Sequence, residues 1–211
     1  MRKVLVASGK GGCGKTTLAT NLAAYWSGRK RNTVAIDADP QGSTLRWCEK
    51  RPDTVPGVLG LTGKRHALER LPPDSHRVVI DSAAGSSVDS LGYWLDAVDA
   101  VVVPILPSTI DLEASLPWLD ALAAHPRVKR GKLPVALVAN RLKPWTNASQ
   151  LATAEMREFP FSLEAELRDS QAYVLLAGLG KGLFDYHSEH VRSHQQDWAR
   201  LLRWLRRCGE S

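Results

Sequence analysis

A glycine-rich segment near the N-terminus constrains this chain more than any other feature of its sequence. Residues 9–17 read Gly-Lys-Gly-Gly-Cys-Gly-Lys-Thr-Thr, which satisfies the pattern G-x-x-x-x-G-K-[ST] and follows an apolar run typical of a strand. Such a loop directs consecutive backbone N–H groups at phosphate oxygens in conformations that a Cβ would forbid, and the helix that follows adds its positive end. The sequence therefore predicts a phosphate-binding loop between a strand and a helix.

The loop also supplies two side chains with separate roles. Lys15 is expected to place its charge on the β- and γ-phosphates of a nucleotide, and the Thr16 hydroxyl is expected to be a ligand of Mg²⁺. The expected nucleotide contacts of the loop and the following helix are Gly11, Gly12, Cys13, Gly14, Lys15, Thr16 and Thr17.

Short β-branched runs alternate with longer segments of helical period along the rest of the chain, which is typical of a parallel sheet covered by helices on both faces. Strands are expected at residues 3–8, 33–37, 77–81, 100–105 and 134–139, with a weaker one at 161–163. Helices are expected at 15–27, 43–50, 86–95, 111–123, 148–158, 170–177 and 188–207, and a loop-rich connection at 52–65. The predicted fold class is α/β: a single P-loop NTPase domain over residues 1–211, with a mostly parallel, twisted sheet.

Two acidic motifs follow the loop, each at the end of a predicted strand. Asp37 and Asp39 lie in the segment Asp-Ala-Asp-Pro-Gln-Gly, and Asp81 follows the apolar run Val-Val-Ile. Because open α/β sheets bind ligands at the carboxyl ends of their strands, these carboxylates should lie beside the phosphate loop. Asp81 is expected to hold Mg²⁺ together with Thr16, usually through water, and Asp37 is expected near the metal.

A second lysine, Lys10, stands at the start of the loop, so that the segment reads Lys-Gly-Gly-x-Gly-Lys-Thr-Thr. In this form it resembles the deviant Walker A box of the ParA/MinD family of P-loop ATPases. The resemblance extends over essentially the whole chain, with its specific motifs in residues 9–85. It implies that the nucleotide is ATP and that two copies form an ATP-sandwich homodimer, in which Lys10 reaches the partner's nucleotide.

The resemblance also suggests roles for residues outside the loop. Asp39 matches the second aspartate of the family's D-x-D-P-Q segment, which positions and activates the attacking water, so Lys10, Lys15 and Asp39 are the expected catalytic residues. Asn140 and Arg141 lie in a segment similar to the one near the adenine, where an amide offers a donor and an acceptor to a base edge. A turn-forming Asn140 is the alternative. After Asp81 the chain reads Ser-Ala-Ala-Gly, where many family members are proline-rich.

The excess of 28 Lys and Arg over 22 Asp and Glu gives a net charge of +6 and is concentrated in two stretches. Residues 127–143 hold six basic and no acidic residues, and residues 191–211 hold five arginines against two acids. In the second stretch, apolar residues form one helical stripe and arginines the opposite face. Such a face binds phosphates without sequence preference, although a merely solvated basic helix is the alternative. The candidate DNA contacts are Arg127, Lys129, Arg130, Arg200, Arg203 and Arg207.

Other classes of protein are disfavoured by what the sequence lacks. Its three cysteines contain no C-x-x-C pair, so a disulfide framework, a zinc site and an iron–sulfur cluster are not expected. The apolar runs are far shorter than the roughly 20 residues of a membrane span, and no signal peptide is recognisable. The phosphate loop begins at residue 9, so no N-terminal helix-turn-helix domain is expected.

Together these features predict a small ParA-like ATPase that is cytoplasmic and nucleoid-associated. Its slow hydrolysis would be stimulated by a partner protein, and its ATP-bound dimer would bind DNA without sequence preference to position a plasmid, a chromosome region or an assembly such as a carboxysome. Two alternatives remain: a MinD-like ATPase whose basic amphipathic C-terminus binds a membrane, and a P-loop metabolic ligase or reductase.

Overall fold

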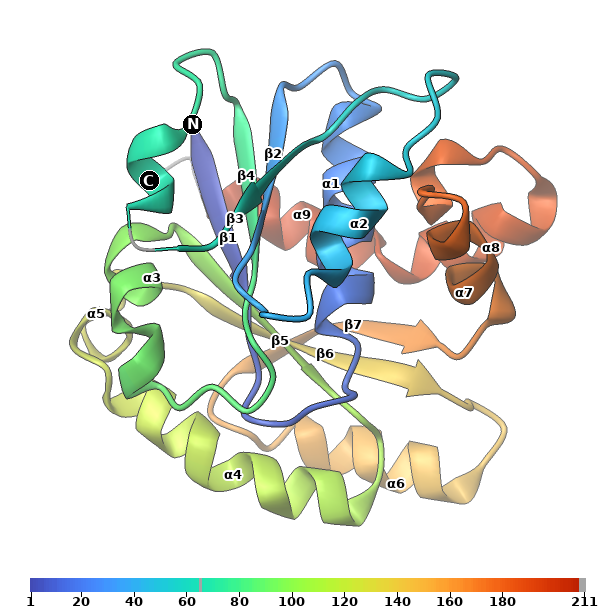
Figure 1. Ribbon diagram of the computed structural model, residues 1–211. Helices are drawn as coiled ribbons and strands as arrows, with labels where there is room; N and C mark the ends of the chain where they lie inside the picture. The colour runs from blue at the N-terminus through green and yellow to red at the C-terminus, as the bar shows by residue number, and fades with distance from the viewer. Residues whose placement is uncertain (65, 209–211) are drawn as a thin grey trace.

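The computed structural model describes residues 1–64 and 66–208, and in this part of the chain seven parallel strands form one sheet (Figure 1). The strands are β1 (Arg2–Val6), β2 (Thr33–Asp37), β3 (Leu59–Thr62), β4 (Arg77–Asp81), β5 (Ala100–Ile105), β6 (Val135–Leu142) and β7 (Ser162–Arg168). Their spatial order is β3-β2-β4-β1-β5-β6-β7, so β1 lies at the centre and the order reverses beside it. This is the topological switch point at which open α/β sheets bind ligands.

Helices cover both faces of the sheet (Figure 1). One face carries α1 (Lys15–Ser27), α2 (Ser43–Glu49), α7 (Gln171–Gly178), η3 (Leu183–Asp185), α8 (Glu189–Asp197) and α9 (Ala199–Arg207). The other carries η1 (Ala67–Arg70), η2 (Asp89–Leu91), α3 (Gly92–Ala97), α4 (Thr109–Ala124), α5 (Pro126–Lys129) and α6 (Asn147–Met156). None of the helices in the described residues has the length and apolar character needed to cross a membrane.

The inner strands β2, β4 and β5 are buried on both faces, as their apolar runs predict. In β1, Val4 and Val6 pack under α1, whereas Leu5 points to the opposite core with α3 and α4. The predicted α/β class, with a parallel sheet between two helical layers, is therefore confirmed.

The sequence-based expectations are wrong in three places. The connection at 52–65 contains the edge strand β3, which the sequence hides because it is four residues long and half-exposed, with Leu59 45% exposed. The helix expected at 188–207 is interrupted at Trp198, whose fully buried indole donates a hydrogen bond to Tyr173 Oη at 3.0 Å. The helix expected at 86–95 starts later, as η2 followed by α3.

A buried ion pair fastens the connection after α2 to η3. Arg51 and Asp185 side chains are 3% and 1% exposed, and the guanidinium donates to both carboxylate oxygens at 3.0 Å. Arg51 also donates to the carbonyl oxygens of Gly180 and Pro56, and Asp185 accepts the Gly182 N–H. All the strong donors and acceptors of this pair are therefore satisfied.

We predict that Asp185→Ala destabilises the protein by about 3–5 kcal/mol, because it leaves the buried guanidinium of Arg51 uncompensated. Urea unfolding followed by circular dichroism measures the change. The control is Glu166→Ala, which removes an exposed ion pair with Arg157. The side chain of Arg157 is 58% exposed and that of Glu166 is 45% exposed. It should cost less than about 1 kcal/mol. Equal losses in the two variants would contradict the prediction.

Candidate nucleotide site

The phosphate loop connects β1 to α1 as predicted, and its backbone explains its glycines. Gly12 and Gly14 have φ values of 76° and 93°, in the left-handed region that disfavours a side chain. Gly14 is the N-cap of α1, and no side chain caps this helix. The first N–H groups of α1 are therefore left to an anion bound in the loop.

The two lysines of the loop have different partners. Lys15 is buried, and its Nζ donates to the Lys10 carbonyl oxygen at 3.1 Å, so its side chain folds back along the loop. Lys10 Nζ instead lies 2.8 Å from Asp111 Oδ1, in the first turn of α4. The other oxygen of Asp111 accepts a hydrogen bond from Ser108 Oγ at 2.5 Å. Hydrogen bonds from Lys10 and Ser108 lower the pKa of Asp111. In the single chain, Lys10 is thus held by a carboxylate.

Asp81, at the end of β4, has the environment of a metal ligand. Its Oδ2 accepts hydrogen bonds from Thr16 Oγ1 at 2.8 Å and Thr44 Oγ1 at 2.7 Å. Its Oδ1 is buried and has no hydrogen-bond partner in the described residues. Burial raises the pKa of Asp81 to about 6, and the two threonine hydroxyls oppose that rise.

These groups fit Mg²⁺. A buried carboxylate oxygen without a donor is costly unless a cation or a donor reaches it. Thr16 and Asp81 present oxygen ligands beside the phosphate loop, and Mg²⁺ usually takes one or two protein ligands, substrate phosphates and water.

Asp37 ends β2 beside Asp81 of the neighbouring strand and Asp39 follows two residues later, and both already accept backbone hydrogen bonds. Asp37 is buried and accepts the N–H groups of Asp39 and Leu45 at 3.0 Å, which fixes the turn into α2. Asp39 accepts the N–H of Gln41 at 2.8 Å and that of Ala84 at 2.9 Å. Asp39 therefore ties the turn after β2 to the segment after Asp81. The predicted roles of Asp37 near the metal and of Asp39 on the attacking water stay predictions.

Asn140 and Arg141, at the end of β6, border the other side of the loop. The Asn140 amide donates to the Cys13 carbonyl at 2.8 Å, and a Cβ on Gly14 would collide with that amide. Asn140 thus braces the loop, and contact with a base edge stays a prediction. Arg141 is exposed, has a left-handed φ of 60° and lies 3.6 Å from Asp169.

A cavity of about 260 Å³ opens beside these residues, where the loop meets the start of α7. Its lining includes Gly12, Thr17, Asn140, Arg141, Gln171 and Tyr173. This cavity adjoins the N-terminus of α1 and lies on the side of the loop that Asn140 borders.

Sequence reasoning missed Thr44, Asp111 and Trp118. Thr44 follows the D-x-D-P-Q-G segment by two residues, but only the fold places its hydroxyl on Asp81. Ser108 caps α4 and Asp111 lies three residues later, which is a recognisable helix start, although nothing in that spacing points to Lys10. The Trp118 indole donates to the Ser86 carbonyl at 2.8 Å, and a Cβ on Gly9 would lie 2.6 Å from its ring. Helix α4 thus contacts both the loop and the segment after Asp81.

Two of the six residues proposed for DNA binding have partners in the described residues, and Arg127 and Arg207 line one cavity. Arg127 donates to the carbonyl oxygens of Leu95 and Val98, at the end of α3, and Arg200 pairs with Glu164 at 3.0 Å. The remaining candidates, Lys129, Arg130, Arg203 and Arg207, are exposed.

Known proteins resemble this chain along most of its length. Two relatives are named Maintenance of carboxysome distribution protein A. The relative from Halothiobacillus neapolitanus is 34% identical over 144 residues, and the match covers 66% of this chain and 66% of the relative, just under two thirds of each. The relative from Gloeobacter kilaueensis is 28% identical, and the match covers 98% of this chain and 94% of the relative. An ATP complex of a McdA variant from Cyanothece shares the fold with a TM-score of 0.71 at 18% identity, over 99% of this chain and 96% of that one. Residues 4–177 match the family described as CobQ/CobB/MinD/ParA nucleotide binding domain, and this chain therefore belongs to that family.

Proposed function

We propose that this protein is a ParA-like ATPase that dimerises when it binds ATP and Mg²⁺, binds DNA without sequence preference, and positions a cargo until a partner protein stimulates hydrolysis. The observation that carries the ATPase proposal is the contact of Thr16 with Asp81 beside the phosphate loop, where the other carboxylate oxygen of Asp81 has no hydrogen-bond partner in the described residues. The relatives named for carboxysome distribution support a protein assembly as the cargo.

The residues of the site supply charge and positioning, which phosphoryl transfer requires more than covalent chemistry. Mg²⁺, when bound, neutralises charge that develops on the phosphate oxygens. When the nucleotide binds, the ammonium group of Lys15 leaves the neutral carbonyl oxygen of Lys10 for the phosphates. This exchange is favourable because an ammonium group bonds an anionic oxygen more strongly than a neutral one. Asp39 orients the attacking water through the acceptor sites that its two backbone hydrogen bonds leave open.

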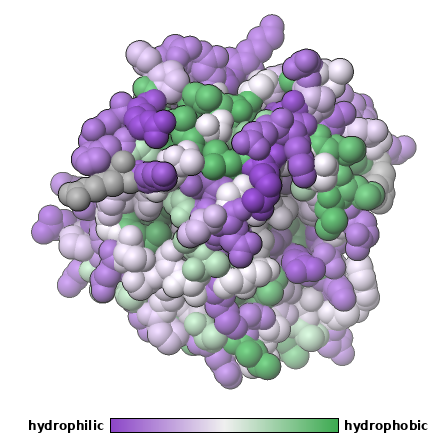
Figure 2. All heavy atoms as spheres, viewed as in Figure 1, coloured by the Kyte–Doolittle hydropathy of each residue, from purple (hydrophilic) through white to green (hydrophobic). Residues whose placement is uncertain are grey.

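Dimerisation requires Lys10 to change its partner as well. In the single chain its ammonium group is paired with Asp111, and both side chains are partly exposed, at 33% and 24%. A partly exposed pair of this kind contributes little to stability, so a partner's phosphates can displace it. Helix α7, which lines the cavity beside the phosphate loop, exposes Val174 and Leu175 by 66% and 68%, and its C-cap Leu179 is 59% exposed. Figure 2 shows hydrophobic residues gathered over this helix. A second copy that covers this side would bury them.

Two other functions fit less well. Binding of the C-terminal helices to a membrane would use their apolar stripe, but Val191, Trp198, Leu201, Leu202 and Leu205 are each at most 7% exposed and form part of the core. A metabolic ligase agrees with the CobQ and CobB part of the family name, yet the relative from Gloeobacter kilaueensis, which aligns with 98% of this chain, is named for carboxysome distribution.

Replacing Lys15 with alanine should weaken ATP binding at least tenfold, because it removes the positive charge closest to the phosphates. Titration with a fluorescent ATP analogue measures the affinity. Lys30→Ala is the control, since Lys30 is exposed just beyond the opposite end of α1. Unchanged ATP affinity in Lys15→Ala would show that the loop does not hold the phosphates.

The variant Asp39→Ala should bind ATP and dimerise but hydrolyse ATP about 10² to 10⁴ times more slowly, as expected when a positioned proton-transfer group is removed. Phosphate release gives the rate, and size-exclusion chromatography with light scattering gives the mass. Turnover at the wild-type rate would exclude Asp39 from the reaction.

In Lys10→Ala, ATP should still bind to the single chain while the ATP-dependent dimer is lost, because no ammonium group reaches the partner's phosphates. The same two measurements, ATP titration and light scattering, separate these effects. A Lys10→Ala protein that dimerises with ATP like the wild type would remove the proposed role in trans.

A further inference from the structure

We infer that the phosphates of nucleic acid are bound in a cationic groove at the end of α1 farthest from the phosphate loop. The groove consists of Arg29, which follows α1, Arg192 on α8, and Arg203 and Arg206 on α9. The inference rests on the DNA binding in the proposed function and identifies its surface. Of the four arginines, only Arg203 is among the DNA contacts predicted from the sequence.

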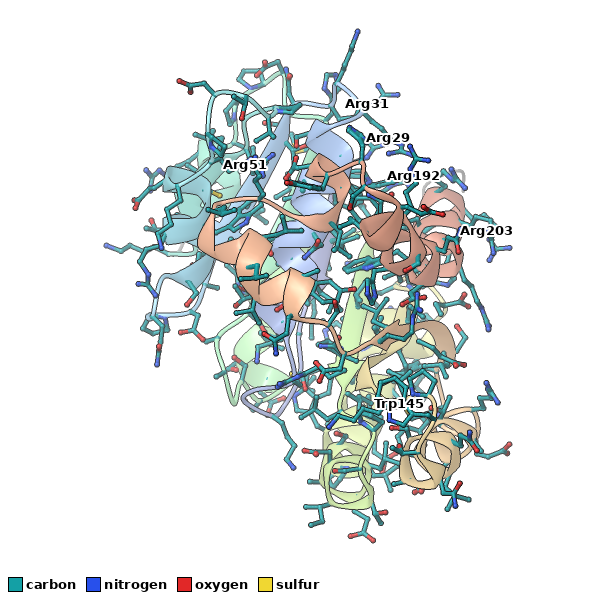
Figure 3. The ribbon with its side chains drawn as sticks, turned by 90° about the vertical axis from the view of Figure 1, so that its right-hand side faces the viewer. Arg29, Arg31, Arg51, Trp145, Arg192 and Arg203 are labelled. Atoms are coloured by element: carbon teal, nitrogen blue, oxygen red, sulfur yellow. The ribbon has the colours of Figure 1, made fainter. Side chains whose placement is uncertain are left out.

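The fold brings these arginines together from distant parts of the chain. They line one cavity of about 560 Å³, with Tyr25 of α1 and Phe184 of η3 at its apolar base. In Figure 3, Arg31, Arg29, Arg192 and Arg203 follow one another along the same side of the molecule, far from Trp145.

The four positive charges of the cationic groove have no acidic partner within the described residues. None of the four arginines takes part in an ion pair there, and no Asp or Glu lines the cavity. Other arginines of the same region are paired: Arg200 with Glu164, Arg168 with Asp197, and Arg51 with Asp185. The groove is therefore a concentration of uncompensated positive charge, which attracts a polyanion.

Buried aromatic contacts fix the walls of the cationic groove. The Arg29 guanidinium lies 3.8 Å above the centre of the Tyr25 ring. That ring meets Phe184 edge-on at 5.0 Å, and Phe184 meets the fully buried Trp198 at 5.8 Å. The spacing between α1 and the C-terminal helices is therefore set by the core, so little ordering is needed when phosphates bind.

Further positive charge borders the groove. Arg31 lies two residues after Arg29 and two residues before β2 begins, and Arg77 begins the neighbouring strand β4. Burial and the nearby charges of Arg2 and Arg31 lower the pKa of Arg77. Arg31 is exposed, whereas Arg77 is half-buried, so Arg31 extends the positive charge of the groove toward the amino end of β2.

The position of the cationic groove is compatible with the ATP-dependent dimer. Helix α1 has 13 residues and is about 20 Å long, with the phosphate loop at one end and the groove just past the other. A dimer joined at the carboxyl ends of the strands would leave one groove open on each copy. Two grooves double the number of phosphates that one particle can contact, which links DNA binding to dimerisation.

The test compares two variants that carry the same change of charge in the ATP-bound state. Arg192→Glu with Arg203→Glu alters the cationic groove, and Lys129→Glu with Arg130→Glu alters the exposed cations around α5. Fluorescence anisotropy of a labelled duplex of random sequence is measured over a series of salt concentrations, and ATP titration verifies that each variant is folded. The neutral pair Arg192→Gln with Arg203→Gln repeats the test without charge reversal.

The groove variants should bind DNA at least tenfold more weakly, and the slope of log affinity against log salt should fall by about 1 for each lost phosphate contact. The α5 variant should keep the wild-type slope. If both charge-reversal variants lose DNA affinity equally, or if the groove variants bind DNA like the wild type, the cationic groove is not the DNA-binding surface. The proposed function would remain intact in either case. A wild-type protein that binds no duplex at low salt would overturn both. If it binds phosphatidylglycerol vesicles through the groove and no duplex, the occupant is a membrane and the inference is wrong.

Discussion

The nucleotide site depends on one buried carboxylate. Asp81 ends the central strand β4 with one oxygen held by Thr16 and Thr44 and the other without a partner in the described residues. Burying a carboxylate oxygen that has no donor destabilises the fold, and apolar packing around the carboxylate does not compensate for the lost hydration. The sheet fixes the carboxylate in this position, because β4 is paired on both sides and each of its last four residues is buried. In the proposed function, a cation bound with phosphate would offset this destabilisation.

Several hydrogen bonds join the segments around Asp81 into one unit. Asp39 accepts the Ala84 N–H, the Trp118 indole donates to Ser86, and Lys10 pairs with Asp111 of the helix that carries Trp118. In the proposed function, the Lys10–Asp111 pair gives way to the phosphates of the partner's nucleotide. The proposed cycle of binding and hydrolysis therefore acts on contacts that already connect the loop, the acidic motifs and α4.

The phosphate loop and the acidic motifs could be predicted from the sequence because their chemistry resides in adjacent residues and in the order of the strands. Strand β3 could not, since a four-residue edge strand lacks a two-sided apolar pattern. The partners of an arginine side chain also depend on tertiary contacts. Arg127 donates to the carbonyl oxygens of Leu95 and Val98, whereas Arg29 and Arg192 line the same cavity only in the folded chain. The distribution of charge along the sequence pointed to the C-terminal arginines, but it gave no sign that Arg29, after α1, lies beside them.

Calorimetric titration of ATP with and without Mg²⁺ tests the role of Asp81 most directly. The wild-type protein should bind ATP more tightly with Mg²⁺ than with EDTA, and Asp81→Asn, which keeps the size of the side chain and removes its charge, should lose that difference. The same affinity in Mg²⁺ and EDTA for the wild type, or an unchanged dependence on Mg²⁺ in Asp81→Asn, would contradict the assignment of Asp81 as the group that holds the metal beside the phosphate loop.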